Sequence, residues 1–168
     1  AFGGTDIVER CLRLVPGSEF QTPLYGDQVP SAWKSVIPNW TFFWIVACRE
    51  YAEHTGNRAF ASDMLPKMLL TLDAYLERVN ADHLLDMKGW NLLDWAPMDQ
   101  PNDGIVTHQN IMLVKALEET IAMAAFVGLA EQTQAYADIA ARIKAAINRH
   151  LWSEDRGAYL DCIHPGGR

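Results

Sequence analysis

The chain has 168 residues, of which 49% are hydrophobic, 21% charged and 10% aromatic, and its net charge is −7. This composition is that of a globular protein and excludes a disordered tail, and no apolar run reaches the roughly 18–20 residues of a membrane-spanning helix. The basic residues are scattered and form no stripe, so we expect neither nucleic acid nor a membrane as a partner.

Five segments have helical periodicity, and they alternate between two patterns of apolar residues. A single apolar stripe is typical of a helix at the surface, whereas a segment that is apolar nearly all round is typical of a helix buried on most sides. In chain order the striped, buried, striped, buried and striped segments are Thr5–Val15, Asn39–Thr55, Arg58–Val79, Thr107–Val127 and Glu131–His150. We therefore expect an all-α fold with two layers of alternating inner and outer helical hairpins.

Local signals mark the boundaries of these segments. Gly56 and Gly128 follow the two broadly apolar segments and indicate their ends, and Pro66 indicates a break or a start within the third. Thr107 is the expected N-cap of the fourth segment. Residues 157–163 alternate polar and apolar after a turn signal, which predicts a short strand or an extended strap.

The connections between the segments alternate in length. Links from a buried to a striped segment are short, whereas Pro16–Pro38 and Asn80–Val106, which lead from a striped to a buried segment, are long. If neighbouring helices are antiparallel, both long connections emerge at the same end of the bundle. Long loops of this kind are usually functional, so we expect the site at that end.

These long connections hold most of the residues suited to sugar chemistry. The flat face of tryptophan packs on the apolar face of a sugar ring, and neighbouring carboxylates bind its hydroxyl groups. The second connection contains Trp90, Asp94, Trp95, Asp99 and Asp103, and the first contains Tyr25, Asp27 and Trp33 and is followed directly by Trp40.

Each tryptophan also has a structural alternative, because a buried indole needs only one partner for its N–H. Trp90 and Trp95 could both plug the end of the bundle, but we interpret Trp95 as a functional residue and Trp90 and Trp33 as structural residues. For Trp40 both interpretations stay open, and Trp44 is expected in the core.

The carboxylates and histidines are less informative. Asp94 could cap a helix or brace its loop as readily as contact a ligand, and Asp99 and Asp103 are typical of turns. His108, at the start of the fourth segment, could point into the site. The other histidines, which have no partner at metal-ligand spacing, are His54, His83, His150 and His164.

The three cysteines, Cys11, Cys48 and Cys162, contain no Cys-x-x-Cys pair. We therefore expect reduced, mostly buried thiols, no metal and no cofactor. Reduced thiols favour a cytoplasmic location.

The sequence Trp90-Asn-Leu-Leu-Asp-Trp-Ala-Pro97 resembles the catalytic domain of bacterial α-L-rhamnosidases. The resemblance extends through Ile37–Trp44 and Tyr51–Asn57 to residues 135–159, and so covers nearly the whole chain. It implies a six-hairpin α/α barrel whose active site lies where the loops enter the inner helices. It also implies inverting hydrolysis of terminal α-L-rhamnosides.

The resemblance further implies which residues bind the sugar. Trp95 matches the family's sugar-stacking tryptophan with Asp94 beside it, and Trp40 resembles another wall of the pocket; Trp90 completes our set of substrate-binding residues. Leu93 stands where the family often has glycine. The family's proton donor, in a motif ending Trp-x-Gly-Asp, would precede the first helix here and its base would follow Arg168, so we expect neither in this chain.

We therefore interpret residues 1–168 as somewhat under half of a glycosidase barrel, inactive alone, which binds a rhamnoside and is completed by the rest of its parent barrel. Its inner helices should leave a large apolar edge. One alternative is a helical scaffold that binds a protein or peptide. An open superhelix with dispersed long loops would favour this alternative. Another is a different α/α-toroid sugar enzyme, such as an epimerase.

Overall fold

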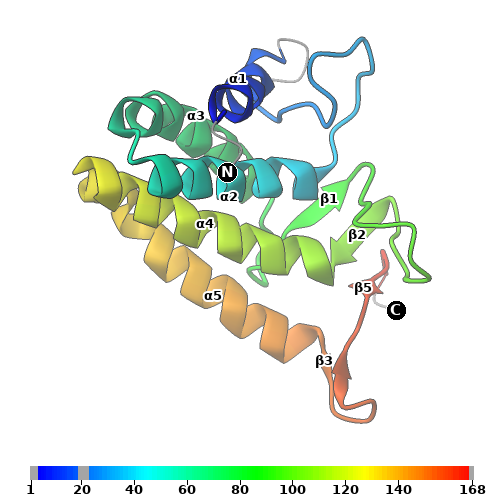
Figure 1. Ribbon diagram of the computed structural model, residues 1–168. Helices are drawn as coiled ribbons and strands as arrows, with labels where there is room; N and C mark the ends of the chain where they lie inside the picture. Colours follow the sequence, from blue (N-terminus) through cyan, green and yellow to red (C-terminus); the bar gives the residue numbers. More distant parts are fainter. Residues whose placement is uncertain (1–3, 19–22, 167–168) are drawn as a thin grey trace.

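A computed structural model describes residues 4–18 and 23–166 of the chain and shows a mainly helical fold (Figure 1). The five predicted helices are confirmed, with α4 correct at both ends and the other boundaries within three residues. They are α1 (Asp6–Leu14), α2 (Pro38–Thr55), α3 (Arg58–Leu76), α4 (Thr107–Val127) and α5 (Gln134–His150), and 3₁₀ turns occupy Val15–Gly17 and Ala130–Thr133.

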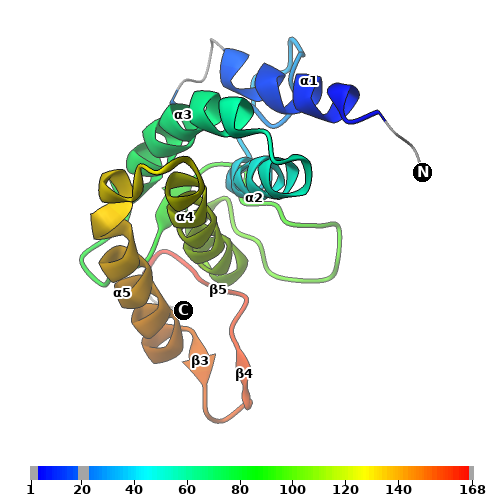
Figure 2. The ribbon, with the colours of Figure 1, turned by 60° about the vertical axis from the view of Figure 1, so that its left-hand side comes forward.

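The helices form the expected two layers. In Figures 1 and 2, α2 and α4 lie side by side and start at the same end, while α1, α3 and α5 pack on their outer sides. The core between the layers is made of fully buried side chains, among them Phe42 and Ile45 of α2 and Leu113 and Leu117 of α4. The alternation of inner and outer helices read from the sequence is therefore confirmed.

Helix α3 is more deeply buried than its narrow stripe predicts. Phe60, Met64 and Tyr75 lie outside the predicted stripe and are nevertheless fully buried, because α3 packs on both inner helices. The guanidinium of Arg13 on α1 lies 5.1 Å from the Phe60 ring centroid and pairs with Asp63 at 3.0 Å. Pro66 lies within α3 and does not break it, which corrects the expected interruption.

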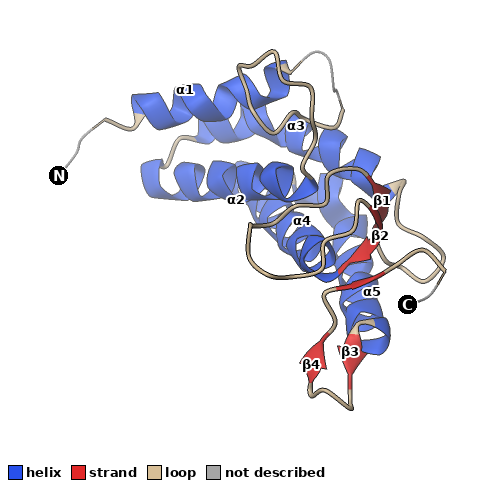
Figure 3. Ribbon diagram, turned by 90° about the vertical axis from the view of Figure 1, so that its right-hand side faces the viewer, coloured by secondary structure: helices blue, strands red, loops and turns tan. Residues whose placement is uncertain are grey.

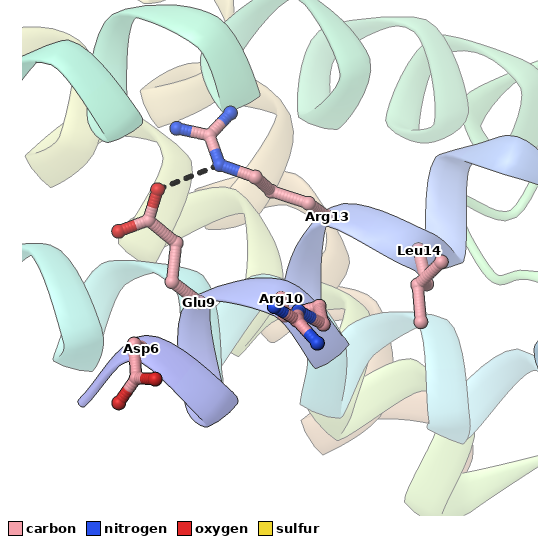
Figure 4. Close-up of a pocket in the computed structure, with 5 residues that line it drawn as sticks. All are labelled: Asp6, Glu9, Arg10, Arg13 and Leu14. Carbon is pink, nitrogen blue, oxygen red and sulfur yellow. Dashed lines mark hydrogen bonds and ion pairs between the residues drawn. The ribbon is translucent and has the colours of Figure 1, made fainter. Parts of the chain in front are cut away.

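Glu9 fastens α1 to the rest of the molecule. Its carboxylate accepts hydrogen bonds from the Tyr51 hydroxyl at 2.6 Å and the Asn57 amide at 3.1 Å, and it pairs with Arg13 at 2.7 Å (Figure 4). These bonds lower the pKa of Glu9, the Tyr51 hydrogen bond most of all. Asn57 also caps α3 by accepting from the Phe60 amide, so one carboxylate links three helices.

Short strands add a small sheet that the sequence patterns did not predict. Strands β1 (Asp86–Lys88), β2 (Asp103–Val106) and β5 (Cys162–Ile163) are antiparallel in the order β1-β2-β5, with Met87 opposite Gly104 and Val106 opposite Cys162. The sheet lies at the starting ends of α2 and α4 (Figure 3). Segments of two to four residues within long loops are too short to show a period.

The predicted strand or strap over residues 157–163 forms two separate strands. Ala158–Tyr159 (β4) pairs with Trp152–Ser153 (β3) in a hairpin, and β5 joins the sheet. The hairpin is supported by an edge-to-face contact between the Trp152 and Tyr159 rings, whose centroids are 5.0 Å apart.

No helix within the described ranges is long and apolar enough to cross a membrane. Several large apolar side chains are exposed, including Phe43 of α2 and Ile111 of α4, at 44% and 46% of their surface. That they belong to a large apolar edge stays a prediction.

Candidate functional site

The two long connections meet at the starting ends of α2 and α4, as the loop lengths predicted. Asn39, in the first turn of α2, donates from Nδ2 to the Leu92 carbonyl at 3.2 Å and lies 2.7 Å from Nδ1 of His108, in the first turn of α4. One buried amide therefore joins both inner helices to the loop of residues 89–102 that holds Trp90 and Trp95. We call this segment the tryptophan loop.

A network of buried amides fixes the base of the tryptophan loop. Asn91 is fully buried and donates to the carbonyls of Met87 at 3.0 Å and Pro101 at 2.9 Å, which draws the two ends of the loop together. Gln109 of α4, also fully buried, donates to Asn91 Oδ1 at 2.9 Å. Its neighbour Asn110 hydrogen bonds both the N–H and the carbonyl of Leu85.

Our sequence reasoning missed this network. Its available signal was the pair Gln109–Asn110 inside an otherwise apolar helix, because buried amides require partners. Those partners are chiefly backbone carbonyls and amides, which sequence patterns do not locate.

Trp95 stands out from the loop. Its side chain is 83% exposed, and it meets the half-buried Trp90 edge to face with ring centroids 6.5 Å apart. An exposed indole supported from one side presents a flat apolar face. Trp95 is therefore not a plug in this structure, whereas Trp90 supports it from below the surface.

Asp94 braces the loop and caps no helix. Its Oδ1 accepts from the Trp95 amide at 2.7 Å, and its carbonyl accepts from the Gln100 side chain at 2.8 Å. Gln100 in turn accepts from the amide of Leu93 at 2.6 Å. Leu93, which precedes the Asp94–Trp95 pair, is thus held in place by the hydrogen bond from its backbone amide.

Trp40 lies on the other side of Asn39, along a groove between α1, α2 and the first long connection. Its ring contacts Phe43 at a centroid distance of 5.9 Å, and the groove is also lined by Asp27 and Val29. Trp40 therefore packs on Phe43, whereas Trp95 packs on Trp90. The two tryptophans are connected through their chain neighbourhoods, by the hydrogen bond from the Asn39 side chain to the Leu92 carbonyl. The role of Trp40 stays a prediction.

The other aromatic residues of the first connection and of α2 differ in burial. Tyr25 is buried and donates to the Lys67 carbonyl at 2.8 Å, and burial raises its pKa to about 12. Trp44 is in the core, as expected, with its indole N–H bound to the Leu12 carbonyl at 2.9 Å. Trp33 is 58% exposed, so the buried structural role expected of it is not seen within residues 1–168.

Thr107 does not cap α4. Helix α4 begins at Thr107 itself, after the extended Val106, and the Thr107 hydroxyl donates to the Leu160 carbonyl at 2.6 Å while its amide donates to the Asp161 carbonyl. The C-terminal strap of residues 160–164 therefore occupies the place where a side-chain cap was expected.

His108 is neutral at physiological pH. Asn39 Nδ2 must be the amide nitrogen because it also donates to a carbonyl, so Nδ1 of His108 accepts and Nε2 bears the proton. Burial lowers the pKa of His108 to about 4. In this part of the described structure, His108 Nε2, Asn39 Oδ1 and Gln109 Oε1 are buried without a protein partner, so one donor and two acceptors are left for an enclosed water molecule to satisfy.

The aspartates beyond the tryptophan pair have specific partners. Asp103 lies in β2 and pairs with Lys88 at 3.3 Å, which corrects its interpretation as a turn residue. Asp99 lies 2.6 Å from Nε2 of His164, and this hydrogen bond lowers the pKa of Asp99. His164 therefore has a partner that its position in the sequence did not reveal.

The cysteines are less uniformly buried than expected. Cys48 is fully buried, and its pKa is strongly raised by burial, whereas Cys11 is exposed. Cys162 is half-buried, and burial raises its pKa to about 11.

Comparison with known proteins decides the family. The family model of the bacterial α-L-rhamnosidase six-hairpin glycosidase domain matches residues 1–164. The chain belongs to this family. The predicted glycosidase fold is confirmed, and the family does not support the scaffold alternative.

Two solved structures are similar to this chain. The GH78 family rhamnosidase of Bacillus sp. GL1 has 62% sequence identity over 100% of the chain, with a TM-score of 0.97. A rhamnosidase from Klebsiella oxytoca with rhamnose bound has the same fold at 20% identity over 98% of the chain, with a TM-score of 0.77. The chain spans only 18% and 32% of these two proteins, respectively. No curated protein matches it.

Proposed function

We propose that this chain supplies part of the sugar-binding wall of a glycoside hydrolase that removes terminal α-L-rhamnosyl groups. The observation that supports this most is the exposed Trp95, held over the meeting point of the inner helices by a fixed loop. Family membership supports the reaction class. The proposed substrate-binding residues are Trp95, Asp94, Trp40 and Trp90.

In this proposal Trp95 stacks on the apolar face of the sugar, and Trp90 prevents its ring from turning away. Asp94 fixes the backbone at Trp95 with one carboxylate oxygen, while the exposed position of its side chain leaves it open to a sugar hydroxyl. The side chains of Asn39, His108 and Gln109 lie at the starts of α2 and α4 and support the same loop from inside, through the bonds of Asn39 to Leu92 and of Gln109 to Asn91.

The proposed mechanism is inverting and needs two carboxyl groups, one that protonates the leaving oxygen and one that activates water, about 6.5–9.5 Å apart. We place both outside residues 1–168, in other parts of the full-length protein. Residues 1–168 then bind and orient the sugar, which lowers the barrier by positioning it for the reaction.

Hydrolysis of an aryl α-L-rhamnoside by the full-length protein tests this function. We expect release of the phenol, an inverted anomer of rhamnose as the first product by NMR, and no activity from the 168-residue chain alone. Retention of configuration would overturn the inverting mechanism, and hydrolysis by the isolated chain would overturn the placement of the carboxylates. Interconversion of free sugars without glycoside hydrolysis would indicate an epimerase instead.

A further inference from the structure

Three potential metal ligands from two distant segments gather beside the tryptophan loop. They are Asp99 of the loop and Cys162 and His164 of the C-terminal strap, and one ligand atom from each lies within 4.8 Å of the other two. The closest pair is Asp99 Oδ2 and His164 Nε2, at 2.6 Å. The side chains of Asp99 and His164 are exposed, and Cys162 is half-buried, so the cluster is open to solvent.

The backbone holds these three residues in place without a metal. Cys162 lies in β5 opposite Val106 of β2, and successive side chains of an extended strand alternate between its faces, so residues two apart share one face. Asp99 is tied to the same strap because its amide donates to Asp161 Oδ2 at 3.1 Å. The two sides of the cluster are therefore joined by bonds that do not use the ligand atoms.

The donor set distinguishes between classes of metal. A sulfur, an imidazole nitrogen and one carboxylate suit zinc, whose ligands lie about 2.0–2.3 Å from the ion and therefore about 3–4 Å from one another in a tetrahedron. Calcium and magnesium take oxygen ligands in larger number and would leave the sulfur and nitrogen unused. The Asp99–His164 pair, at 2.6 Å, is closer than two ligands of one zinc ion and would have to separate to admit it.

We propose that Asp99, Cys162 and His164 form a Zn²⁺ site, with water as the fourth ligand. The ion links the tryptophan loop, four residues beyond Trp95, to the C-terminal strap, and so stiffens the loop from its far side. This site does not depend on the proposed rhamnosidase function, since its claim concerns metal binding alone.

Metal titration of the full-length protein tests the proposal. After treatment with a chelator, the wild type and the C162S and H164A variants are titrated with Zn²⁺ in competition with a chromogenic chelator, and with Co²⁺ as a spectroscopic probe of thiolate ligation. The matched controls are C11S and H54A, which remove an exposed thiol and an exposed imidazole elsewhere.

We expect the wild type to bind one equivalent of Zn²⁺ that C162S and H164A do not bind, or that they bind more than about 100-fold more weakly. A loss of this size indicates a direct ligand, because loss of an outer-shell partner lowers metal affinity by only about 10–100-fold. The thiolate–Co²⁺ absorption should disappear in C162S and persist in C11S. Equal Zn²⁺ binding by wild type and both variants overturns the proposal. If C162S fails to fold by circular dichroism, H164A decides alone, because its side chain is exposed.

Discussion

At the scale of single residues, the polar side chains between helices determine both the docking of α1 and the charge state of the site. Glu9 collects hydrogen bonds from three other residues, and His108 is held neutral between the starts of α2 and α4. Both have a lowered pKa in the folded protein, so both link stability to pH.

Replacement of Glu9 by Gln should destabilise the protein at neutral pH, because it removes the ionised partner of Tyr51 and Arg13. A carboxyl group whose pKa is lowered by folding contributes stability above its unfolded pKa of about 4.3, and this contribution is lost as the pH falls through its lower folded pKa. Thermal denaturation of E9Q and wild type should therefore differ at pH 7 and converge in acid. The control E131Q changes an exposed carboxylate before α5 and should match wild type throughout; a gap for E9Q that is independent of pH would contradict the account.

Replacement of His108 by Asn should reduce the pH dependence of the free energy of unfolding between about pH 6.5 and pH 4. The pKa of His108 is about 4 when folded and about 6.5 when unfolded, so the unfolded state takes up the proton first and stability falls from about pH 6.5 down to 4. The slope is at most about 1.4 kcal/mol per pH unit for one proton. Unfolding measured across this range should show a smaller slope in H108N, with Asp161 the charged neighbour in both proteins; identical slopes would show that His108 is not buried as described.

At the scale of elements, the small sheet and the C-terminal strap set the position of the tryptophan loop. The loop leaves β1 and returns to β2, and β2 is itself held against β5. The backbones come close at Gly104, which has a φ of +116°, where an added Cβ would lie 2.6 Å from the Ile163 carbonyl oxygen.

Replacement of Gly104 by Ala should therefore separate β2 from β5. We expect a loss of local stability of about 1–3 kcal/mol from backbone strain, with the steric conflict in addition. Hydrogen exchange of the amides in β2 and β5 should become faster by at least about tenfold. G89A is the matched control, since nothing lies within 4 Å of an added Cβ there; equal protection in G104A and wild type would refute the close approach.

At the scale of the whole molecule, much of the architecture could be predicted from the sequence. The broadly apolar runs of α2 and α4 required burial on most sides, and the long loops before them predicted the end of the bundle at which the candidate site lies. The amide network could not be predicted, because Asn91 and Gln109 bind groups that have no sequence signature. Nor could the pairing of Asp99 with His164, which are 65 positions apart and are brought together by the short pairing of β2 with β5 and by the bond of the Asp99 amide to Asp161.

The central claim is that the tryptophan loop forms a wall of a rhamnose-binding pocket. Calorimetric titration of L-rhamnose into the full-length protein tests it most directly, with W95A as the variant and W152A, on the β3–β4 hairpin, as the control. Loss of a stacking face should weaken binding by about tenfold or more, equivalent to about 1.4 kcal/mol, in W95A and leave W152A close to wild type. Unchanged affinity in W95A would contradict the account.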